Sequence, residues 1–261
     1  MHTWDPDRYL TYADERGRPF VDLLARIGAT EPDTVADLGC GPGNLTTLLA
    51  KRWPGAVVTG VDSSPAMIKA ARRDHVDAGA FEIGDVRDWS APGGVDVLVS
   101  NATLQWLPDH LDLLPRLVDQ VRPGGWLAFQ VPGNFDEPSH TIRNELAAEA
   151  AYAAHTAGVA LPASHDPGVY LDALAALGCT VDVWETTYLH VLDSAEDPDP
   201  VFTWVSGTGA RPTLQALPDG LRAEFETEFR ARLRAAYPVR EHGVVLPFRR
   251  VFAVARVEDG R

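Results

Sequence analysis

The residues of this chain that could do chemistry stand directly after short apolar segments. The run Asp-Leu-Gly-Cys-Gly-Pro-Gly-Asn occupies residues 37–44, and Asp62, Asp85 and Asn101 each follow a later segment of the same kind. If these segments are parallel strands, their carboxyl ends meet along one edge of a sheet, where open α/β sheets bind ligands. Carboxylates, an amide and bare backbone at that edge suit a small ligand with hydroxyl and amino groups.

The glycines of the first run narrow the choice of ligand. Gly39, Gly41 and Gly43 lack the Cβ atoms that would hold a ligand away from the backbone. A nicotinamide dinucleotide site favours the spacing Gly-x-Gly-x-x-Gly, which seats a pyrophosphate on the following helix. Here Asn44 stands where the last glycine should be. The spacing therefore disfavours a nicotinamide-dependent dehydrogenase.

Each downstream polar residue also has a purely structural interpretation. Asp62 can accept hydrogen bonds from ribose hydroxyls, but it can equally cap a helix that begins near Pro65. Asp85 suits a turn, and Asn101 suits a hydrogen bond within a loop. Their occurrence at successive strand ends favours ligand binding for the set.

The loop at 37–44 resembles that of class I methyltransferases, which bind S-adenosylmethionine on a Rossmann-like sheet. The resemblance implies that the loop holds the amino-acid end of the cofactor and that Asp62 holds the ribose. It also implies adenine contacts from Asp85 and Val86, and a methionine contact from Asn101. The full set of implied cofactor-binding residues is Asp37, Gly39, Gly41, Gly43, Asn44, Asp62, Ser63, Met67, Asp85, Val86 and Asn101.

The elements that must position these residues alternate between apolar strands and helices. Such repetition predicts parallel strands joined by right-handed crossovers, with helices on both faces of the sheet. The predicted strands are 34–38, 56–61, 80–83, 95–100 and 126–131, and the predicted helices between them are 45–51, 65–73 and 111–121, after an amphipathic opening at 16–27.

The second half is less regular. Helices are expected at 138–155 and at 167–177, the latter ending at Gly178, and strands at 179–184 and 246–257. The segment 197–237 is mostly helical in pattern and too long for a connection within a minimal sheet, so it predicts a cap.

We therefore expect a single methyltransferase domain over residues 1–261. Its fold would be an α/β, Rossmann-like class I methyltransferase sheet, mostly parallel, with seven strands, an antiparallel last strand and a helical cap. The expected division is a core of approximately 30–132 plus 179–193 and 244–257, and a cap of approximately 133–178 and 194–243.

Several segments resemble a narrower family, the trans-aconitate 2-methyltransferases. They include Trp-Asp-Pro at 4–6, the run 101–110, Trp-Glu-Thr-Thr-Tyr at 184–188 and the Thr-Gly-Ala-Arg-Pro run at 208–212. The resemblance extends through nearly the whole chain, including the expected cap. It implies an S-adenosylmethionine-dependent O-methyltransferase that forms the monomethyl ester of trans-aconitate, a small polycarboxylic acid.

Methyl transfer to a carboxylate makes modest chemical demands. Free carboxylic acids titrate near ~4, so the nucleophile is ionised at neutral pH and an in-line displacement needs no general base. The enzyme must supply proximity, alignment and exclusion of water. It must also hold the carboxylates that do not react, for which the planar fork of arginine is suited.

The candidate arginines are Arg211, in the Thr-Gly-Ala-Arg-Pro run, and Arg249. Arg249 precedes Arg250 on the last strand, and only one of the pair can face the site because strand neighbours alternate between faces. The face of an aromatic ring attracts a cation, so Trp106 could form the pocket wall near the sulfonium of the cofactor. Each candidate also has a purely structural interpretation, as an arginine exposed to solvent or an aromatic residue packed in the core. The predicted substrate-binding residues are Arg211, Arg249, Tyr188, Tyr9 and Trp106.

Composition excludes several classes of partner. The net charge of −14 argues against nucleic acid and against an anionic membrane surface. The longest apolar runs are short of the ~18–20 residues of a membrane span, and the amino-terminal residues have no signal-peptide pattern. Cys40 and Cys179 are too few for a disulfide framework or a structural zinc site. We expect a cytoplasmic protein without a metal, as a monomer or weak homodimer.

Alternative functions stay open at this point. The acceptor could be another small or carrier-bound acid, or a natural-product hydroxyl, although no His–Asp pair is placed to deprotonate a hydroxyl. A non-catalytic regulator that binds S-adenosylmethionine is the alternative from a different class.

Overall fold

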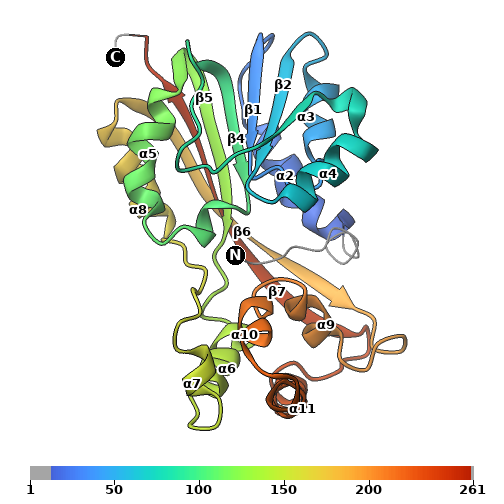
Figure 1. Ribbon diagram of the computed structural model, residues 1–261. Helices are drawn as coiled ribbons and strands as arrows, with labels where there is room; N and C mark the ends of the chain where they lie inside the picture. The colour runs from blue at the N-terminus through green and yellow to red at the C-terminus, as the bar shows by residue number, and fades with distance from the viewer. Residues whose placement is uncertain (1–12, 260–261) are drawn as a thin grey trace.

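One sheet of seven strands organises the computed structural model, which describes residues 13–259 (Figure 1). The strand order is β3-β2-β1-β4-β5-β7-β6. The first five strands are parallel, and β7 is antiparallel to both β5 and β6. The predicted fold class is thereby confirmed. The strands are β1 Thr34–Leu38, β2 Val57–Asp62, β3 Ala80–Ile83, β4 Val95–Asn101, β5 Val121–Pro132, β6 Cys179–Leu192 and β7 Val244–Val257.

Helices cover both faces of the sheet. α2 (Ala13–Ala25) and α3 (Thr46–Arg52) pack on one face, and α5 (His110–Asp119) packs on the other, while α4 (Pro65–Asp74) packs against β2 and β3. Figure 1 shows α5 on the opposite side of the sheet from α2, α3 and α4. Two short 3-10 turns, η1 (Val76–Ala78) and η2 (Leu104–Trp106), complete this half.

Local sequence explains where α4 begins. The Ser64 side chain accepts a hydrogen bond from the Met67 backbone N–H at 3.4 Å, and Pro65 occupies the first helical turn. Proline is favoured there because its missing N–H would have no partner within the helix. This helix start, directly after β2, places Asp62 and Ser63 at the edge of the sheet.

One helix from the second half belongs to the sheet layers. α8 (Pro167–Ala176) packs against β6 and β7, and its Tyr170 and Leu174 are fully buried in the same core cluster as α5. The range 133–178 assigned to the cap on sequence includes this helix. Within that range, α8 covers the face of the sheet that β6 and β7 would otherwise expose. The predicted division stays a prediction.

The remaining helices form a cluster at one end of the sheet, below it in Figure 1. The expected helix at 138–155 is two helices separated by turns. α11 packs against α6 and α9, and aromatic residues of α11 join the core cluster of the sheet face that α2 and α3 cover. These helices are α6 Pro138–Ala147, α7 Ala153–Thr156, α9 Pro200–Ser206, α10 Arg211–Ala216 and α11 Asp219–Ala236.

β6 and β7 extend from the sheet into this helical cluster as a two-stranded ribbon. Along β7 the residues from Val244 to Arg250 alternate between buried and half-buried, whereas Val251 to Ala255 are all buried. The change follows from packing, since the ribbon is covered on one face and the sheet on both. The exposed face of the ribbon carries Leu189 and Val191. β6 reaches beyond the predicted end at 184 because it pairs with β7 as far as Leu192.

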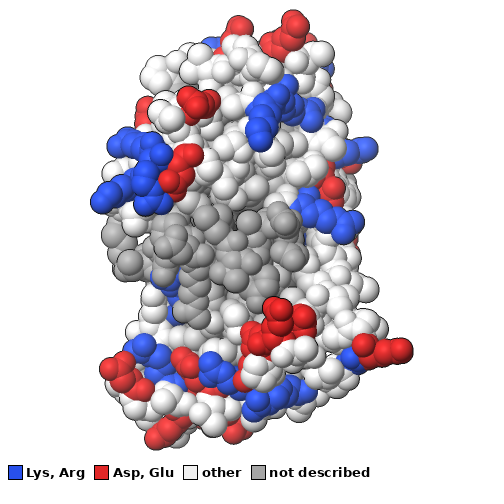
Figure 2. Space-filling view, turned by 90° about the vertical axis from the view of Figure 1, so that its right-hand side faces the viewer, with Lys and Arg blue, Asp and Glu red and all other residues white. Residues whose placement is uncertain are grey.

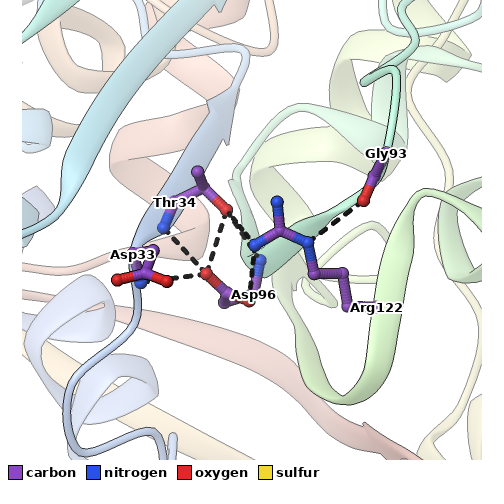
Figure 3. A network of polar contacts seen from close by, with 5 residues as sticks. All are labelled: Asp33, Thr34, Gly93, Asp96 and Arg122. Carbon is purple, nitrogen blue, oxygen red and sulfur yellow. Dashed lines mark hydrogen bonds and ion pairs between the residues drawn. The ribbon is translucent and has the colours of Figure 1, made fainter.

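A polar network fastens the edge of the sheet opposite the glycine loop (Figure 3). Asp96 accepts hydrogen bonds from the backbone N–H groups of Asp33 and Thr34 at 2.9 and 2.8 Å. Arg122 donates to Asp96 at 2.8 Å and to the Gly93 carbonyl at 3.0 Å. The network joins the amino ends of β1 and β4 to the start of β5, and so fixes the strands whose other ends carry the site.

None of the helices within residues 13–259 combines the length and hydropathy that a membrane span requires. Figure 2 shows that basic and acidic side chains both occur on the upper and lower parts of the face it displays.

Candidate functional site

A pocket of about 610 Å³ lies at the carboxyl ends of the parallel strands. Nine residues named from the sequence line it: Gly39, Gly41, Asp62, Ser63, Met67, Asp85, Val86, Asn101 and Trp106. The remaining lining residues are Pro42, Ser64, Pro65, Ala66, Gly84, Arg87, Ala102, Thr103, Leu107 and Ala160. Polar groups from four strand ends therefore converge on one cavity.

The three glycines of the loop serve different purposes. All have positive φ angles, of 79°, 57° and 82°. A Cβ on Gly39 would lie 2.0 Å from Thr103 Oγ1, and a Cβ on Gly43 would lie 2.8 Å from the Phe81 ring. Around Gly41 no heavy atom that the structure describes lies within 4 Å of such a Cβ. Of the three, only Gly41 would hold a Cβ in open space, while Gly39 and Gly43 allow close packing of Thr103 and Phe81.

Asp62 is held rigidly at the pocket wall. Its two carboxylate oxygens accept hydrogen bonds from the backbone N–H of Gly41 at 3.0 Å and of Ser64 at 2.8 Å. Burial raises the pKa of Asp62, and these two bonds act against that shift. Because a carboxylate oxygen can accept more than one hydrogen bond, the fixed Asp62 retains acceptor capacity for ligand hydroxyls.

Asp85 and Arg87 form an ion pair at the rim of the pocket. The Arg87 guanidinium donates to the Asp85 carboxylate at 2.9 and 2.6 Å, and the Arg87 backbone N–H donates at 2.9 Å. The hydrogen bond from Arg87 lowers the pKa of Asp85. Sequence analysis missed Arg87, although a charged residue two positions after a predicted strand-end carboxylate could have indicated it.

The end of β4 carries a strained residue. Ala102 has a φ of 52°, and is the one non-glycine residue with positive φ in the described part of the chain. Its N–H donates to the Gln130 carbonyl at 2.9 Å, and its carbonyl accepts from Gln105 Nε2 at 2.6 Å. Such strain persists where the surroundings enforce it and is concentrated at functional sites. It turns the chain so that Asn101, Ala102 and Thr103 all face the pocket.

Three loop residues named as cofactor contacts are not among the residues that line the pocket: Asp37, Gly43 and Asn44. Asp37 is 2% exposed and accepts a hydrogen bond from Thr46 Oγ1 at 2.6 Å. Burial raises the pKa of Asp37 to about 6, the bond from Thr46 lowers it, and the charge of Asp62 raises it. Asp37 thereby ties the end of β1 to the start of α3.

The predicted substrate residues are scattered. Trp106 lines the pocket, and the half-buried Arg211 begins α10. The Tyr188 hydroxyl donates to Asp22 at 2.5 Å. Burial raises the pKa of Tyr188, as does the hydrogen bond to Asp22. Tyr9 lies outside the described residues.

Arg249 and Arg250 separate as alternation requires, but Arg250 is the buried one. The Arg249 guanidinium pairs with Glu185 at 2.5 Å and with Asp166 at 2.9 Å, on the side of the strand away from α2. Arg250 is 6% exposed, and its guanidinium carbon lies 4.3 Å from the centre of the Phe248 ring. The inward member of the pair is therefore Arg250.

A second group missed by sequence analysis positions the segment before Arg211. The buried Arg143 of α6 donates to the Gly209 carbonyl, and a Cβ on Gly209 would lie 2.7 Å from the His140 ring. His140 is buried, and burial together with the Arg143 charge lowers its pKa to about 3. The glycine of the Thr-Gly-Ala-Arg-Pro run thus allows α6 to pack closely against this segment.

Within residues 13–259 no three His, Cys, Asp or Glu side chains are grouped as metal ligands. The pocket lining described above contains no histidine. The pocket lining combines hydrogen-bonding groups with one aromatic side chain, that of Trp106.

Comparisons with known proteins agree with this description. A family model described as a methyltransferase domain matches residues 35–125. A trans-aconitate 2-methyltransferase of Streptomyces avermitilis is 52% identical over 98% of this chain and 97% of its own length. A protein of the same name from Mycobacterium tuberculosis is 45% identical over 99% of this chain and 98% of its own.

Solved structures agree on the fold. The YcgJ protein from Bacillus subtilis matches with a TM-score of 0.61 at 11% identity, over 95% of this chain and all of the other. A geranyl diphosphate C-methyltransferase from Streptomyces coelicolor, solved with S-adenosylhomocysteine, matches with a TM-score of 0.55 at 18% identity. That match covers 95% of this chain and 82% of the other.

Proposed function

The chain belongs to the trans-aconitate 2-methyltransferase family, and we propose that it methylates one carboxylate of trans-aconitate to give the monomethyl ester. It is an enzyme that uses S-adenosylmethionine. The observation that supports the acid as acceptor is the full-length match, because relatives of that name align with 98% of the chain, helical cluster included.

The pocket residues fit the cofactor. Asn101 Oδ1 is buried, and no described residue gives it a hydrogen bond; an ammonium group would supply the missing donor. Asp62 would accept hydrogen bonds from the ribose hydroxyls, since two backbone amides already fix its carboxylate. Gly39, Gly41 and Ser63 would surround the amino-acid and ribose portions, with Asp85, Val86 and Met67 around the adenine.

The loop residues that do not line the pocket would act by stabilising the conformation of the loop. Asp37 and Asn44 contribute through contacts that keep the loop in place, since Thr46 donates to Asp37 and the Asn44 carbonyl accepts from Thr47 Oγ1 at 2.6 Å. Gly43 contributes by admitting Phe81.

When bound, the cofactor would supply an electrophilic methyl group, which a carboxylate oxygen could accept with the thioether as leaving group and without transfer of a proton. The protein then has to align the two reactants and exclude water. Trp106 would wall the reacting centre. Arg211 and Tyr188, with Tyr9, would hold the acid, and the helices from α6 to α7 and from α9 to α11 would close over it.

A methyl-transfer assay tests the proposal. Labelled S-adenosylmethionine is offered with trans-aconitate, cis-aconitate, citrate and isocitrate, and with Asp62→Ala beside the wild type. We expect a base-labile methyl ester formed mainly from trans-aconitate and lost in the variant. Cofactor binding without a methylated acid would contradict the proposed substrate and direct the search to carrier-bound acids.

A further inference from the structure

The side chain of Gln130 in β5 is a buried amide that stabilises no part of the fold through hydrogen bonds. It is 1% exposed, and neither its Oε1 nor its Nε2 has a hydrogen-bond partner among the described residues. Its backbone carbonyl, by contrast, is used by Ala102. Burying an amide without a partner destabilises a protein, and nearly all buried polar groups are paired. The unpaired amide of Gln130 therefore indicates that a bound ligand supplies its hydrogen-bond partner.

Gln130 belongs to a row of polar side chains across three neighbouring strands. It pairs in register with Asn101 of β4 on one side and with Phe252 of β7 on the other, and Pro132 pairs with Arg250. We call Asn101, Gln130 and Arg250 the polar row. Adjacent strands are about 4.8 Å apart, so the polar row spans about 10 Å from β4 to β7.

The three side chains of the polar row lie on the same face of the sheet. Residues two apart on a strand share a face. Each member stands two residues from a strand neighbour in the core cluster that α2 and α3 cover: Val99, Ala128 and Phe252. Arg249 lies on the other face, where its guanidinium forms ion pairs with Glu185 and Asp166.

One end of the polar row lies in the cofactor pocket and the other carries a positive charge. Asn101 lines the pocket. Arg250, at the far end, is buried, and its charge reaches Tyr188, whose pKa it acts to lower. An acid whose reacting carboxylate lies near Asn101 would thus extend its remaining carboxylates along the polar row toward Arg250. A carboxylate accepts hydrogen bonds from amide N–H groups and pairs with guanidinium groups.

We propose that Gln130 is a substrate-binding residue, whose Nε2 donates to a carboxylate that is not methylated, with Arg250 pairing to the same end of a di- or tricarboxylate. The inference rests on the proposed function in that an acid is the methyl acceptor. It adds recognition by β5 and β7 of the sheet to the contacts proposed above for Arg211, Tyr188 and Tyr9.

Two substitutions of Gln130 test the assignment. Gln130→Met keeps the length and approximate volume of the side chain and removes both polar atoms. We expect KM for trans-aconitate to rise about tenfold to hundredfold, the range for a hydrogen bond to a charged group, with the Kd of S-adenosylmethionine unchanged. Gln130→Glu places a carboxylate beside Arg250 in competition with the acid, so a larger rise is expected.

Thermal unfolding of the ligand-free protein separates binding from a structural role. If Gln130 serves only the acid, replacing its unpaired amide by methionine leaves the unfolding midpoint equal or higher, since an unpaired buried polar group is removed. Gln120→Met is the matched control. Gln120 caps the end of α5, directly before β5, and accepts a hydrogen bond from the Ala91 N–H at 2.8 Å, so its loss should affect stability and leave KM unchanged.

The outcomes distinguish this inference from the proposed function. If the wild type methylates trans-aconitate and Gln130→Met leaves KM unchanged, or lowers only the midpoint, the inference is wrong and the function stands. If the wild type methylates none of the acids, the proposed function fails. Calorimetry of citrate and trans-aconitate with the complex of S-adenosylhomocysteine then decides: binding that Gln130→Met abolishes supports the inference, and absence of binding to the wild type overturns it too.

Discussion

Arg249 and Arg250 are consecutive residues of β7 with opposite environments. Arg249 pairs with two carboxylates, those of Glu185 at 2.5 Å and Asp166 at 2.9 Å, which are themselves partly exposed to solvent. Arg250 is buried on the face that α2 covers. The sequence predicts that only one of the two can face the site, and the structure favours Arg250.

We expect Arg250→Met to raise KM for the acid about tenfold or more, because it removes a charge-assisted contact. Arg249→Met should leave KM unchanged and alter the free energy of unfolding by about 0–1 kcal/mol, as exposed ion pairs do. Steady-state kinetics at saturating cofactor, with urea unfolding of both variants, checks this pair. A rise in KM confined to Arg249→Met would reverse the assignment.

Asp62 should govern affinity for the cofactor. In Asp62→Asn the side chain loses its charge, and its amide nitrogen would face one of the N–H groups of Gly41 and Ser64. We expect the Kd of S-adenosylmethionine to rise about tenfold to hundredfold, measured by calorimetry. The matched control is Asp33→Asn, since Asp33 stands directly before β1, at the amino end of a strand whose carboxyl end carries the loop. Equal affinities of Asp62→Asn and the wild type would remove Asp62 from the site.

The glycines of the loop should differ in what alanine does to them. Gly39→Ala brings its Cβ within 2.0 Å of Thr103 Oγ1, so we expect a large loss of stability. Gly41→Ala meets no described neighbour, and its left-handed φ costs only about 1–2 kcal/mol. The variant should fold and lose cofactor affinity, which thermal unfolding and calorimetry would show. A folded Gly41→Ala with normal affinity would mean that the ligand does not approach this backbone.

Asp37 should make the protein less stable as the pH rises. Burial raises its pKa from 3.8 to about 6, so the folded state binds the proton more tightly than the unfolded chain. Its contribution is most favourable below about pH 4, declines between about pH 4 and 6, and is constant above. At about 1.4 kcal/mol per pKa unit, the ionised group costs about 3 kcal/mol at pH 7.5.

The difference between the wild type and Asp37→Asn isolates this contribution. Asparagine keeps an oxygen that accepts the Thr46 hydroxyl, so the variant should be the more stable at pH 7.5 and lose the advantage toward pH 4. Urea unfolding of the cofactor-free proteins at pH 4.5, 6 and 7.5 measures it. Parallel pH profiles would mean that Asp37 is not buried as an ionised group.

The rate of methyl transfer should not depend on pH near neutrality. The acid is ionised above about pH 6, because carboxylic acids titrate near ~4, and the described pocket lining holds no histidine. We expect kcat/KM for the acid to be flat from about pH 6.5 to 9. A rise with a midpoint near 6.5 would reveal a general base of the histidine type and contradict the proposed mechanism.

Much of the sheet half could be predicted from the sequence. The strands at 34–38 and 80–83 agree with the structure to the residue, and the polar strand ends come together as expected. These features are local, since each strand is a short apolar run bounded by turn residues. The same local pattern predicts the position of the pocket.

What the sequence could not provide depends on contacts between distant residues. Gly43 looks like its neighbours, but Phe81 decides its role. The lengths of β6 and β7 depend on their pairing with each other, and Gln130 stands within an apolar strand whose partners are set by the sheet order. The oligomeric state and the cellular compartment stay predictions, as does the contribution of Tyr9.

The ribbon of β6 and β7 has a mechanical consequence. Its register runs unbroken from the pair Cys179–Val257 in the sheet to the pair Leu192–Val244 among the helices. The helical cluster is therefore joined to the sheet by a continuous pair of hydrogen-bonded strands, and not by a flexible linker alone. Bending this ribbon would break hydrogen bonds between its two strands, whereas twisting it would preserve them. We therefore expect the helical cluster to move relative to the sheet by torsion of the ribbon.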